Sequence, residues 1–390
     1  MHRNYVLICT SAMVTGTFCI ALFCFIVNPY DLYPSVAQIS PNVRTDLFYK
    51  LRLHKPYVMQ EVKARHIIVG SSRSASLPTG ALSSPGDPAY NAALPGVTLR
   101  EVRRMVEHAQ AIQPLKSVFI EVDYYMFRRG YSDLTAHYED NRLLRINPSP
   151  REKLGYFYQR FLDFWGTLNS VGAILDSWKA LYVNDGSQRT YNRDGTWEAA
   201  ASHGRTAKWL FSMLVRQEFE EFSKNGDDLD LSEFTRILAF CSDQGIETTV
   251  LISPLHASIL NTVALAGKWQ SYLSWQRSVV EAAQPYRDNV TIIGIEDNPN
   301  IVLQPIEASP SFFRDGVHYN DDAGAQIMDC LVKNDCSESI KPVHLDTNNL
   351  GVYLEGISRL MLEYRITNAQ DYAQLLRWVG MPANHKMAAP

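Results

Sequence analysis

The pattern of apolar and polar positions opens with a long apolar run. No charged side chain occurs from Tyr5 to Asn28, and most residues there are apolar. A helix of about 24 residues, rising about 1.5 Å per residue, spans a hydrocarbon core of about 30 Å. The run ends at Pro29 without a small-residue cleavage site, and Phe23 before Cys24 fits a lipoprotein site poorly. The pattern favours an uncleaved transmembrane anchor over residues 1–30 rather than a signal peptide.

The charges on either side of this anchor predict its orientation. Arg3 and the amino terminus precede it, whereas the first charge beyond it is Asp31 and the next base is Arg44. Cytoplasmic flanks carry the excess of basic residues. We therefore expect a single-pass membrane protein with a cytoplasmic N-terminus and a periplasmic or extracellular main domain.

Beyond a connector over residues 31–64, with an amphipathic helix near Leu47–Leu53, short apolar runs alternate with helical patterns. A capping box at Thr98–Glu101 opens one helix. Gly245 stops another. The runs predict parallel strands, and the alternation predicts an α/β three-layer sandwich. The expected strands are His66–Val69, Ser117–Val122, Thr248–Ile252 and Val290–Ile295, and later helices are expected at 266–284 and 322–332.

Residues 126–230 interrupt this alternation and are expected to form a helical insert or cap. They separate a core of residues 65–125 from a second core part at 231–337, and a helical extension follows at 338–390. Aromatic residues at helical spacing gather near the start of the insert. Buried packing is favoured for them over a sugar-binding groove. They are Tyr156, Tyr158, Phe161, Phe164 and Trp165.

Composition narrows the class of protein. With 46% hydrophobic residues, 20% charged residues and a net charge of -4, the chain is typical of a globular protein without a basic stripe for nucleic acid. No CxxC pair or His/Cys cluster suggests zinc, and we expect neither a metal nor another cofactor. Cys330 and Cys336 are close enough to pair in an oxidising compartment, although spacing does not establish geometry.

Two polar motifs follow the predicted apolar runs. Gly70-Ser71-Ser72-Arg73 follows the first strand, and Asp315-Gly316-Val317-His318 occurs late in the chain. Because an Asp and a His three residues apart can lie on one turn, the carboxylate can fix the imidazole tautomer and leave the other nitrogen for a serine. Taken singly, the serine motif is explained as readily by an ordinary turn, and the late motif by a surface aspartate and a histidine with ordinary hydrogen bonds.

Together these motifs resemble the conserved blocks of the SGNH (GDSL-like) hydrolases, in the same order. Gly70-Ser71-Ser72-Arg73 stands at the first block, which makes Ser72 the matching nucleophile. Tyr90-Asn91-Ala92-Ala93-Leu94-Pro95-Gly96 is similar to the second block, where Gly96 takes the place of an oxyanion-hole glycine. Asp315-Gly316-Val317-His318 resembles the last block, where His318 is the general base and Asp315 orients it. The resemblance covers roughly residues 65–130 and 230–335.

The chain departs from the family pattern at two places. Ser71 and Arg73 replace the aspartate and the leucine of the first block. The third block, Gly-x-Asn-Asp in the family, reads Val122-Asp123-Tyr124-Tyr125-Met126 and has no asparagine. Besides the amides of Ser72 and Gly96, the Tyr125 hydroxyl is a candidate donor to the oxyanion hole, and Asp123 is an alternative occupant of the site. Loss of one such donor costs about 10²–10³ in rate.

Three further residues are candidates for substrate binding. They are Arg73, beside the nucleophile, Asn91 in the second block, and His256, which follows a predicted strand at the same edge of the sheet. The alternative for Arg73 is a structural ion pair. The alternative for His256 is a loop histidine whose ring nitrogens are hydrogen-bonded within the protein.

The resemblance and the anchor together imply a function. We expect a membrane-anchored serine esterase or O-acyltransferase acting on ester groups of a cell-envelope or exported polysaccharide. The partners would be this acylated carbohydrate and the membrane, through residues 5–28, with no nucleic acid. A catalytically silent binding or assembly protein on the same scaffold is the alternative, and a third possibility is that the anchor binds a membrane-protein partner.

Overall fold

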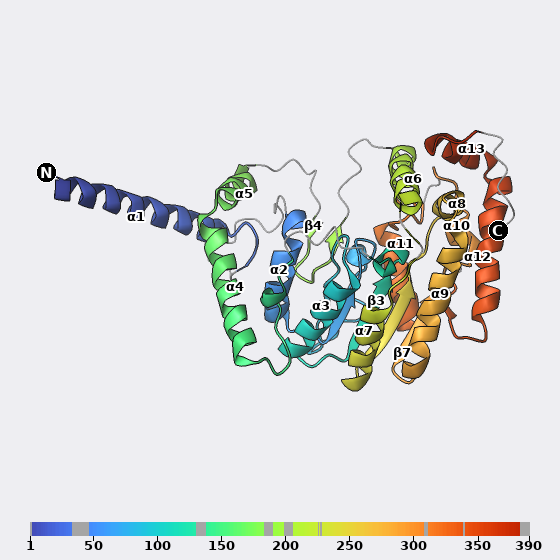
Figure 1. Ribbon diagram of the computed structural model, residues 1–390, viewed down its shortest axis with the longest axis horizontal. Helices are drawn as coiled ribbons and strands as arrows, with labels where there is room; N and C mark the ends of the chain where they lie inside the picture. The colour runs from blue at the N-terminus through green and yellow to red at the C-terminus, as the bar shows by residue number, and fades with distance from the viewer. Residues whose placement is uncertain are drawn as a thin grey trace.

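A mostly parallel sheet forms the centre of the molecule (Figure 1). The computed structural model describes residues 2–32, 47–129, 138–182, 190–198, 206–224, 226, 228–307, 311–337 and 340–382. Within them the sheet has the order β2-β1-β3-β6-β7-β8, and only β8 runs antiparallel to its neighbour. Its strands are β1 (His66–Val69), β2 (Ala89–Asn91), β3 (Ser117–Val122), β6 (Glu247–Ile252), β7 (Val290–Gly294) and β8 (Val343–His344).

The predicted α/β class and the four predicted strands are confirmed. Buried and mostly apolar residues run along β1 and β3, and Ile67 and Ile68 are both fully buried because both faces of the sheet are covered. The register pairs Ile67 with Val118 and Ile120 with Val250. All the carboxyl ends of these parallel strands therefore meet at one edge, where the candidate motifs begin.

Helices surround this sheet, and α3, α7 and α9 contact one another in series. The predicted capping box of α3 is confirmed, since the Glu101 amide donates to Thr98 and the Glu101 carboxylate accepts from the Thr98 amide. The helices are α2 (Leu47–Val62), α3 (Leu99–Ile112), α7 (Ser232–Asp243), α8 (Ala257–Leu265), α9 (Trp269–Ala283), α10 (Pro299–Val302), α11 (Asp321–Lys333), α12 (Leu350–Thr367) and α13 (Ala369–Trp378).

Two segments expected to lie outside the core belong to it. Helix α2 lies in the predicted connector, yet its Lys55 is fully buried and donates to the carbonyls of Asn91, at 2.7 Å, and Gly195, at 2.9 Å. Burial lowers the pKa of Lys55 to about 7, against the opposing charge of Asp194. The predicted C-terminal extension supplies β8 and the buried face of α12. Part of the connector, residues 33–46, lies outside the described residues.

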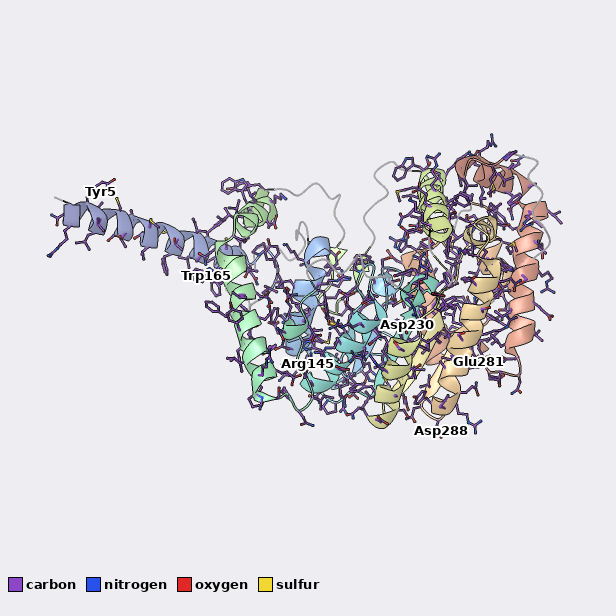
Figure 2. The ribbon with its side chains drawn as sticks, viewed as in Figure 1. Tyr5, Arg145, Trp165, Asp230, Glu281 and Asp288 are labelled. Atoms are coloured by element: carbon purple, nitrogen blue, oxygen red, sulfur yellow. A yellow bond between two sulfur atoms is a disulfide. The ribbon has the colours of Figure 1, made fainter. Side chains whose placement is uncertain are left out.

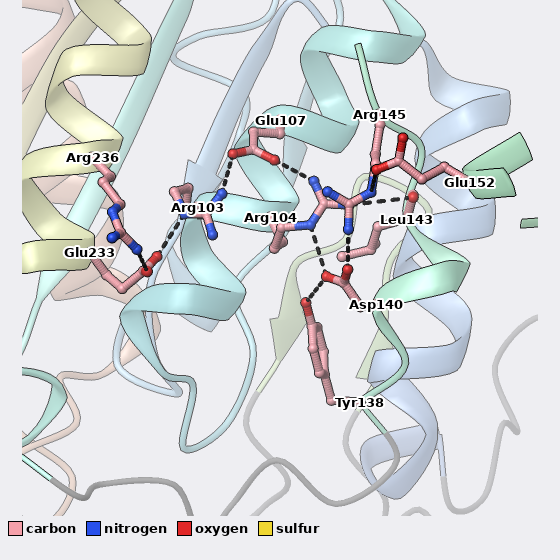
Figure 3. A network of polar contacts seen from close by, with 10 residues as sticks. All are labelled: Arg103, Arg104, Glu107, Tyr138, Asp140, Leu143, Arg145, Glu152, Glu233 and Arg236. Atoms are coloured by element: carbon pink, nitrogen blue, oxygen red, sulfur yellow. Dashed lines mark hydrogen bonds and ion pairs between the residues drawn. The ribbon is translucent and has the colours of Figure 1, made fainter. Parts of the chain in front are cut away.

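The insert after β3 contains η2 (Tyr124–Phe127), η3 (Asp140–Arg142), α4 (Pro150–Asn169), α5 (Val171–Tyr182), α6 (Ala207–Lys224) and the hairpin of β4 (Thr190–Tyr191) and β5 (Trp197–Glu198). Residues 130–137, 183–189, 199–205, 225 and 227 of the predicted insert lie outside the described residues. Arg104 on α3 pairs with Asp140 at 2.9 Å, and Arg103 pairs with Glu233 on α7 at 2.6 Å (Figure 3). This charged network joins the start of the insert to the core.

Helix α1 (His2–Val27) projects from one end of the molecule (Figure 1). Its segment Arg3–Val27 is long and apolar enough to cross a membrane, and none of its apolar window is buried. Its last turn packs against α4 and α5, where a small separate core contains Cys24, Tyr30, Leu32, Tyr57 and Ala173. Helix α1 is therefore joined to the folded domain by packing.

Cys330 and Cys336 form a disulfide with 4.1 Å between their Cα atoms. It links the last turn of α11 to the residues that follow, so the two cysteines that sequence spacing left undecided are paired.

Candidate functional site

Ser72 lies in the turn between β1 and η1 (Ser74–Ser76), at the carboxyl edge of the sheet. Gly70 precedes this turn with φ of +154°. A β-carbon there would lie 2.8 Å from the carbonyl oxygen of Glu121 on β3, so no side chain fits. The sequence Gly-Ser-Ser therefore lets the chain leave β1 close against β3 and present the hydroxyl of Ser72.

The other motif, at residues 315–318, forms a tight hairpin-like loop before α11. Phe313 and Tyr319 form a β-bridge at its base, and the Arg314 amide donates to the His318 carbonyl at 2.8 Å. The loop is held from the neighbouring β6 side, since the His256 amide donates to the carbonyl of Gly316 at 3.0 Å. These contacts fix His318 and Asp315 on one rigid turn.

The structure brings Ser72, His318 and Asp315 into one hydrogen-bonded chain. The Ser72 Oγ lies 2.8 Å from the His318 Nε2, and the His318 Nδ1 lies 2.8 Å from the Asp315 Oδ2. Because an ionised carboxylate only accepts, Nδ1 carries the proton and Nε2 is left to accept from the serine hydroxyl. This is the arrangement in which an imidazole can take a proton from an attacking serine.

Asp315 is held in its ionised form. Burial alone would raise its pKa, but the charge of His318 and the hydrogen bonds from its ring and amide outweigh this, and the pKa falls to about 2. The other carboxylate oxygen accepts from the amides of Val317, at 3.2 Å, and His318, at 2.8 Å. The carboxylate therefore orients the ring through contacts on both of its oxygens.

The second motif lies beside the serine turn. The Leu94 amide donates to the carbonyl of Gly70 at 3.0 Å, which ties the two loops together. Gly96 has φ of +56°, a left-handed conformation that favours glycine. Within the described part of the chain, the amides of Ser72 and Gly96 donate to no other group. Both amides are free to bind an oxyanion, although their role as such donors stays a prediction.

Asn91 does not face the substrate side, contrary to the sequence-based prediction. Its side chain is fully buried, and its amide nitrogen donates to the carbonyls of Ser74, at 2.8 Å, and Leu77, at 3.0 Å. Its side-chain oxygen accepts from the Ala93 amide at 3.0 Å. Asn91 therefore braces the loop that follows Ser72, because its hydrogen-bonding capacity is taken up by backbone groups.

His256 is also wrong as a substrate-binding residue. Its ring is 1% exposed, Nε2 donates to the carbonyl of Gln304 at 2.6 Å, and Nδ1 accepts from the Ser258 amide at 3.0 Å as the N-cap of α8. Burial lowers its pKa to about 4, although the bond to Gln304 opposes this. His256 is a neutral capping residue, as the alternative interpretation held.

Arg73 forms the predicted alternative, a buried ion pair. Its Nη1 lies 2.5 Å from the Asp123 Oδ1, and the side chains are 9% and 0% exposed. The contact is one of charge rather than an aligned hydrogen bond, since neither carboxylate oxygen of Asp123 accepts one in the described part of the chain. The two departures from the family pattern, Arg73 and Asp123, are thus partners of each other.

The end of β3 holds both candidate loops, the one with Ser72 and the one with His318. Asp123 holds the serine turn through Arg73, and Glu121 accepts from the hydroxyl of Tyr319, next to His318, at 2.8 Å. Burial and the neighbouring Asp123 charge raise the pKa of Glu121 to about 7, against the bond from Tyr319 and the charge of Arg73. A charged residue inside an apolar strand was the only signal for this role.

Tyr125 lies on η2, on the wall of a small pocket of about 10 Å³ that also contains Arg73, Glu218 and Ser253. A pocket of that size holds about one water molecule. The donation of the Tyr125 hydroxyl to an oxyanion stays a prediction. Among the described residues, no group of three or more His, Cys, Asp or Glu side chains is arranged to hold a metal ion.

A comparison with models of known protein families finds no match, and a search of curated protein sequences finds none either.

Proposed function

We propose that this chain is a membrane-anchored serine esterase or O-acyltransferase of the SGNH type. The observation that carries the proposal is the chain of two 2.8 Å hydrogen bonds from Ser72 through His318 to Asp315. The parallel sheet supports it, because the three motifs follow its strands in the order of the family blocks. We further propose that the sheet and its helices form the three-layer sandwich of that family.

The chemistry proposed is two-step acyl transfer. His318 takes the Ser72 proton as the Oγ attacks an ester carbonyl, and the resulting imidazolium is stabilised by Asp315. The amides of Ser72 and Gly96 bind the oxyanion. The proton on His318 then passes to the departing alcohol, which leaves an acyl group on Ser72. Water or a sugar hydroxyl attacks this acyl group next and gives up its proton to His318. As the bond between the acyl carbon and the Ser72 Oγ breaks, His318 returns the proton to the Oγ, which restores the serine.

The substrate class and the compartment are part of the proposal. Helix α1 supports a membrane location by its length and apolar surface. The Cys330–Cys336 disulfide supports an outward-facing domain, because such bonds persist in oxidising compartments. We infer ester groups of a cell-envelope or exported polysaccharide as the substrate from this location and from the resemblance to the family.

Labelling with a fluorophosphonate probe tests the chemistry without knowledge of the natural substrate. The purified full chain in mild detergent should be labelled at Ser72, and Ser72→Ala should remove the label. Ser76→Ala is the matched control, because the Ser76 hydroxyl is buried and has no hydrogen-bond partner in the described part of the chain. It should label like the parent protein.

The second candidate is a catalytically silent binding or assembly protein, favoured by the missing asparagine of the third block. Turnover of an activated acetyl ester separates the two. Hydrolysis by the parent protein that vanishes in Ser72→Ala supports the enzyme. Equal trace hydrolysis by both proteins, together with no probe labelling, refutes the enzyme and favours the binding protein. If turnover is present, adding a sugar acceptor and measuring its acylated product decides between transfer and hydrolysis.

A further inference from the structure

Helices α4 and α5, which contact each other, both expose apolar side chains. On α4 the exposed positions follow helical spacing, with Phe161 60% and Trp165 53% exposed. On α5 the same holds for Trp178, at 57%, and Tyr182, at 68%. The predicted buried packing of the aromatic residues here is wrong for Tyr158, Phe161 and Trp165. We define the α4–α5 face as Leu154, Phe157, Tyr158, Phe161, Leu162, Trp165, Val171, Leu175, Trp178, Leu181 and Tyr182.

The opposite sides of these helices turn polar groups toward the protein. Asp163 on α4 is bound by the Arg142 guanidinium through Nε, at 2.6 Å, and Nη2, at 2.9 Å, and it also accepts from the Tyr57 hydroxyl at 2.8 Å. Thr167 and Ser177 are likewise buried. A helix facing water buries its apolar side. The protein-facing sides also carry apolar residues, Ala173 and the partly buried Phe164. These helices therefore present a second apolar side outward, and from it we infer apolar surroundings for the α4–α5 face.

The α4–α5 face lies where α1 enters the domain. Helix α4 runs across the end of α1, with α5 beside them (Figure 1), and Trp165 lies next to the junction (Figure 2). Asp176 of α5 accepts from the hydroxyl of Tyr30, just beyond α1, at 2.6 Å. A membrane that holds α1 therefore has its surface close to α4 and α5.

We propose that the α4–α5 face lies in the interfacial layer of the same bilayer that α1 crosses. Trp and Tyr side chains favour that layer, and an amphipathic helix there buries its apolar side among the acyl chains. Exposed basic residues, Arg151, Lys153 and Lys179, are placed to meet lipid head groups. The inference rests on the proposed anchoring by α1, but not on the chemistry of Ser72.

A bilayer fits this surface better than a sugar or a protein partner. Aliphatic Leu154, Leu162, Val171 and Leu175 lie between the rings, whereas a sugar platform needs polar groups beside its aromatic residues. Helix α1, whose apolar window is not buried, also contacts both α4 and α5. Because lipid around the proposed membrane span of α1 would reach this surface, a protein partner would have to displace that lipid in order to bind.

Tryptophan fluorescence reports the contact directly. The full chain, with its seven tryptophans, is reconstituted in phosphatidylcholine vesicles containing a minority of phosphatidylglycerol, with and without brominated phosphatidylcholine as quencher. Helix α1 contains no tryptophan, so its insertion adds no signal. Trp165→Phe and Trp178→Phe should each lose part of the quenchable emission. Trp209→Phe is the control, since Trp209 is 45% exposed on α6, away from α1 (Figure 1), and its loss should leave the quenchable part unchanged.

A second set of variants changes the surface itself. Phe161→Glu and Leu175→Glu should reduce quenching, whereas Ile366→Glu, at an 82% exposed site on α12, should not. Flotation with the vesicles measures the anchoring by α1 separately. A chain that floats but shows no quenching, or equal losses in all three tryptophan variants, overturns the membrane contact alone. A chain that fails to float overturns the anchoring as well, and probe labelling of Ser72 is unaffected by either result.

Discussion

The buried ion pair of Arg73 and Asp123 allows a quantitative test of what holds the serine turn against β3. Replacing Arg73 by methionine removes the charge that faces Asp123, while Glu121 and Glu218 stay close by. Since both partners are almost inaccessible to water, solvent screening does not reduce the effect. We expect Arg73→Met to lower the free energy of unfolding by about 3–5 kcal/mol, because it leaves a buried carboxylate without its counter-charge.

The partner substitution should cost less. In Asp123→Asn the guanidinium keeps the charges of Glu121 and Glu218 nearby, so we expect a loss of about 1–2 kcal/mol. The double variant has neither charge and should be more stable than the sum of the two losses predicts, by at least about 2 kcal/mol. That difference is the coupling energy of the pair.

Urea unfolding of the full chain in mild detergent at neutral pH, followed by tryptophan fluorescence, measures these values. Arg103 and Glu233 supply the matched control, because their ion pair is 2.6 Å long but about a fifth of each side chain is exposed. Arg103→Met with Glu233→Gln should give a coupling of no more than about 1 kcal/mol. If Arg73 and Asp123 prove additive within about 0.5 kcal/mol, the ion pair does not fix the end of β3 to the serine turn.

Three other substitutions test separate parts of the site. Asp315→Asn should slow fluorophosphonate labelling of Ser72 by about 10³-fold or more, because the ring loses its fixed tautomer; an unchanged labelling rate would remove Asp315 from the mechanism. Gly70→Ala should destabilise the protein by more than about 2 kcal/mol in urea unfolding, since its β-carbon would meet the Glu121 carbonyl, whereas Gly80→Ala, with open space around it, should stay within about 0.5 kcal/mol. Burial depresses the pKa of His256 to about 4, so the unfolded chain binds this proton first and about 3 kcal/mol of stability is lost as pH falls from about 6.5 to about 4. His256→Asn keeps a capping acceptor that cannot be protonated, and unfolding curves across this range should show a smaller loss than the parent protein; an equal loss would contradict the assignment.

The strands and the three motifs were predictable because their signals are local. An apolar run bounded by Gly and Ser marks β1, and the capping box at Thr98 marks the start of α3. Parallel strands bring their carboxyl ends together, so the meeting of Ser72 with His318 followed from chain order and fold class.

The features that the sequence did not predict depend on the direction in which individual side chains point. Helix α8 is buried on nearly all sides, so its sequence has no amphipathic pattern by which to predict it. Without that helix, His256 was expected to lie in a loop open to substrate and not at a helix N-cap. Strand β2 has only three residues inside a stretch rich in Pro, Gly and Ser. Pro56 within α2 and the polar Lys55 made that helix resemble a connector.

The stripe of aromatic residues on α4 illustrates the same limit. Its spacing predicted a helix with one apolar side, and that helix is present. Spacing alone does not say what the apolar side faces. The exposure of Phe161 and Trp165, together with the position of Asp163 toward the protein, shows that it faces outward.

The packing of Cys24 and Tyr30 against Ala173 also determines how far the protein can reach. A domain joined to a membrane helix by a flexible linker sweeps a volume around its point of attachment, whereas here the end of α1 packs into the domain itself. With α1 spanning a membrane as proposed, Ser72 would stand at a fixed height above that membrane. Under the proposed function, ester groups on more distant polymer strands would then have to come to that height to react.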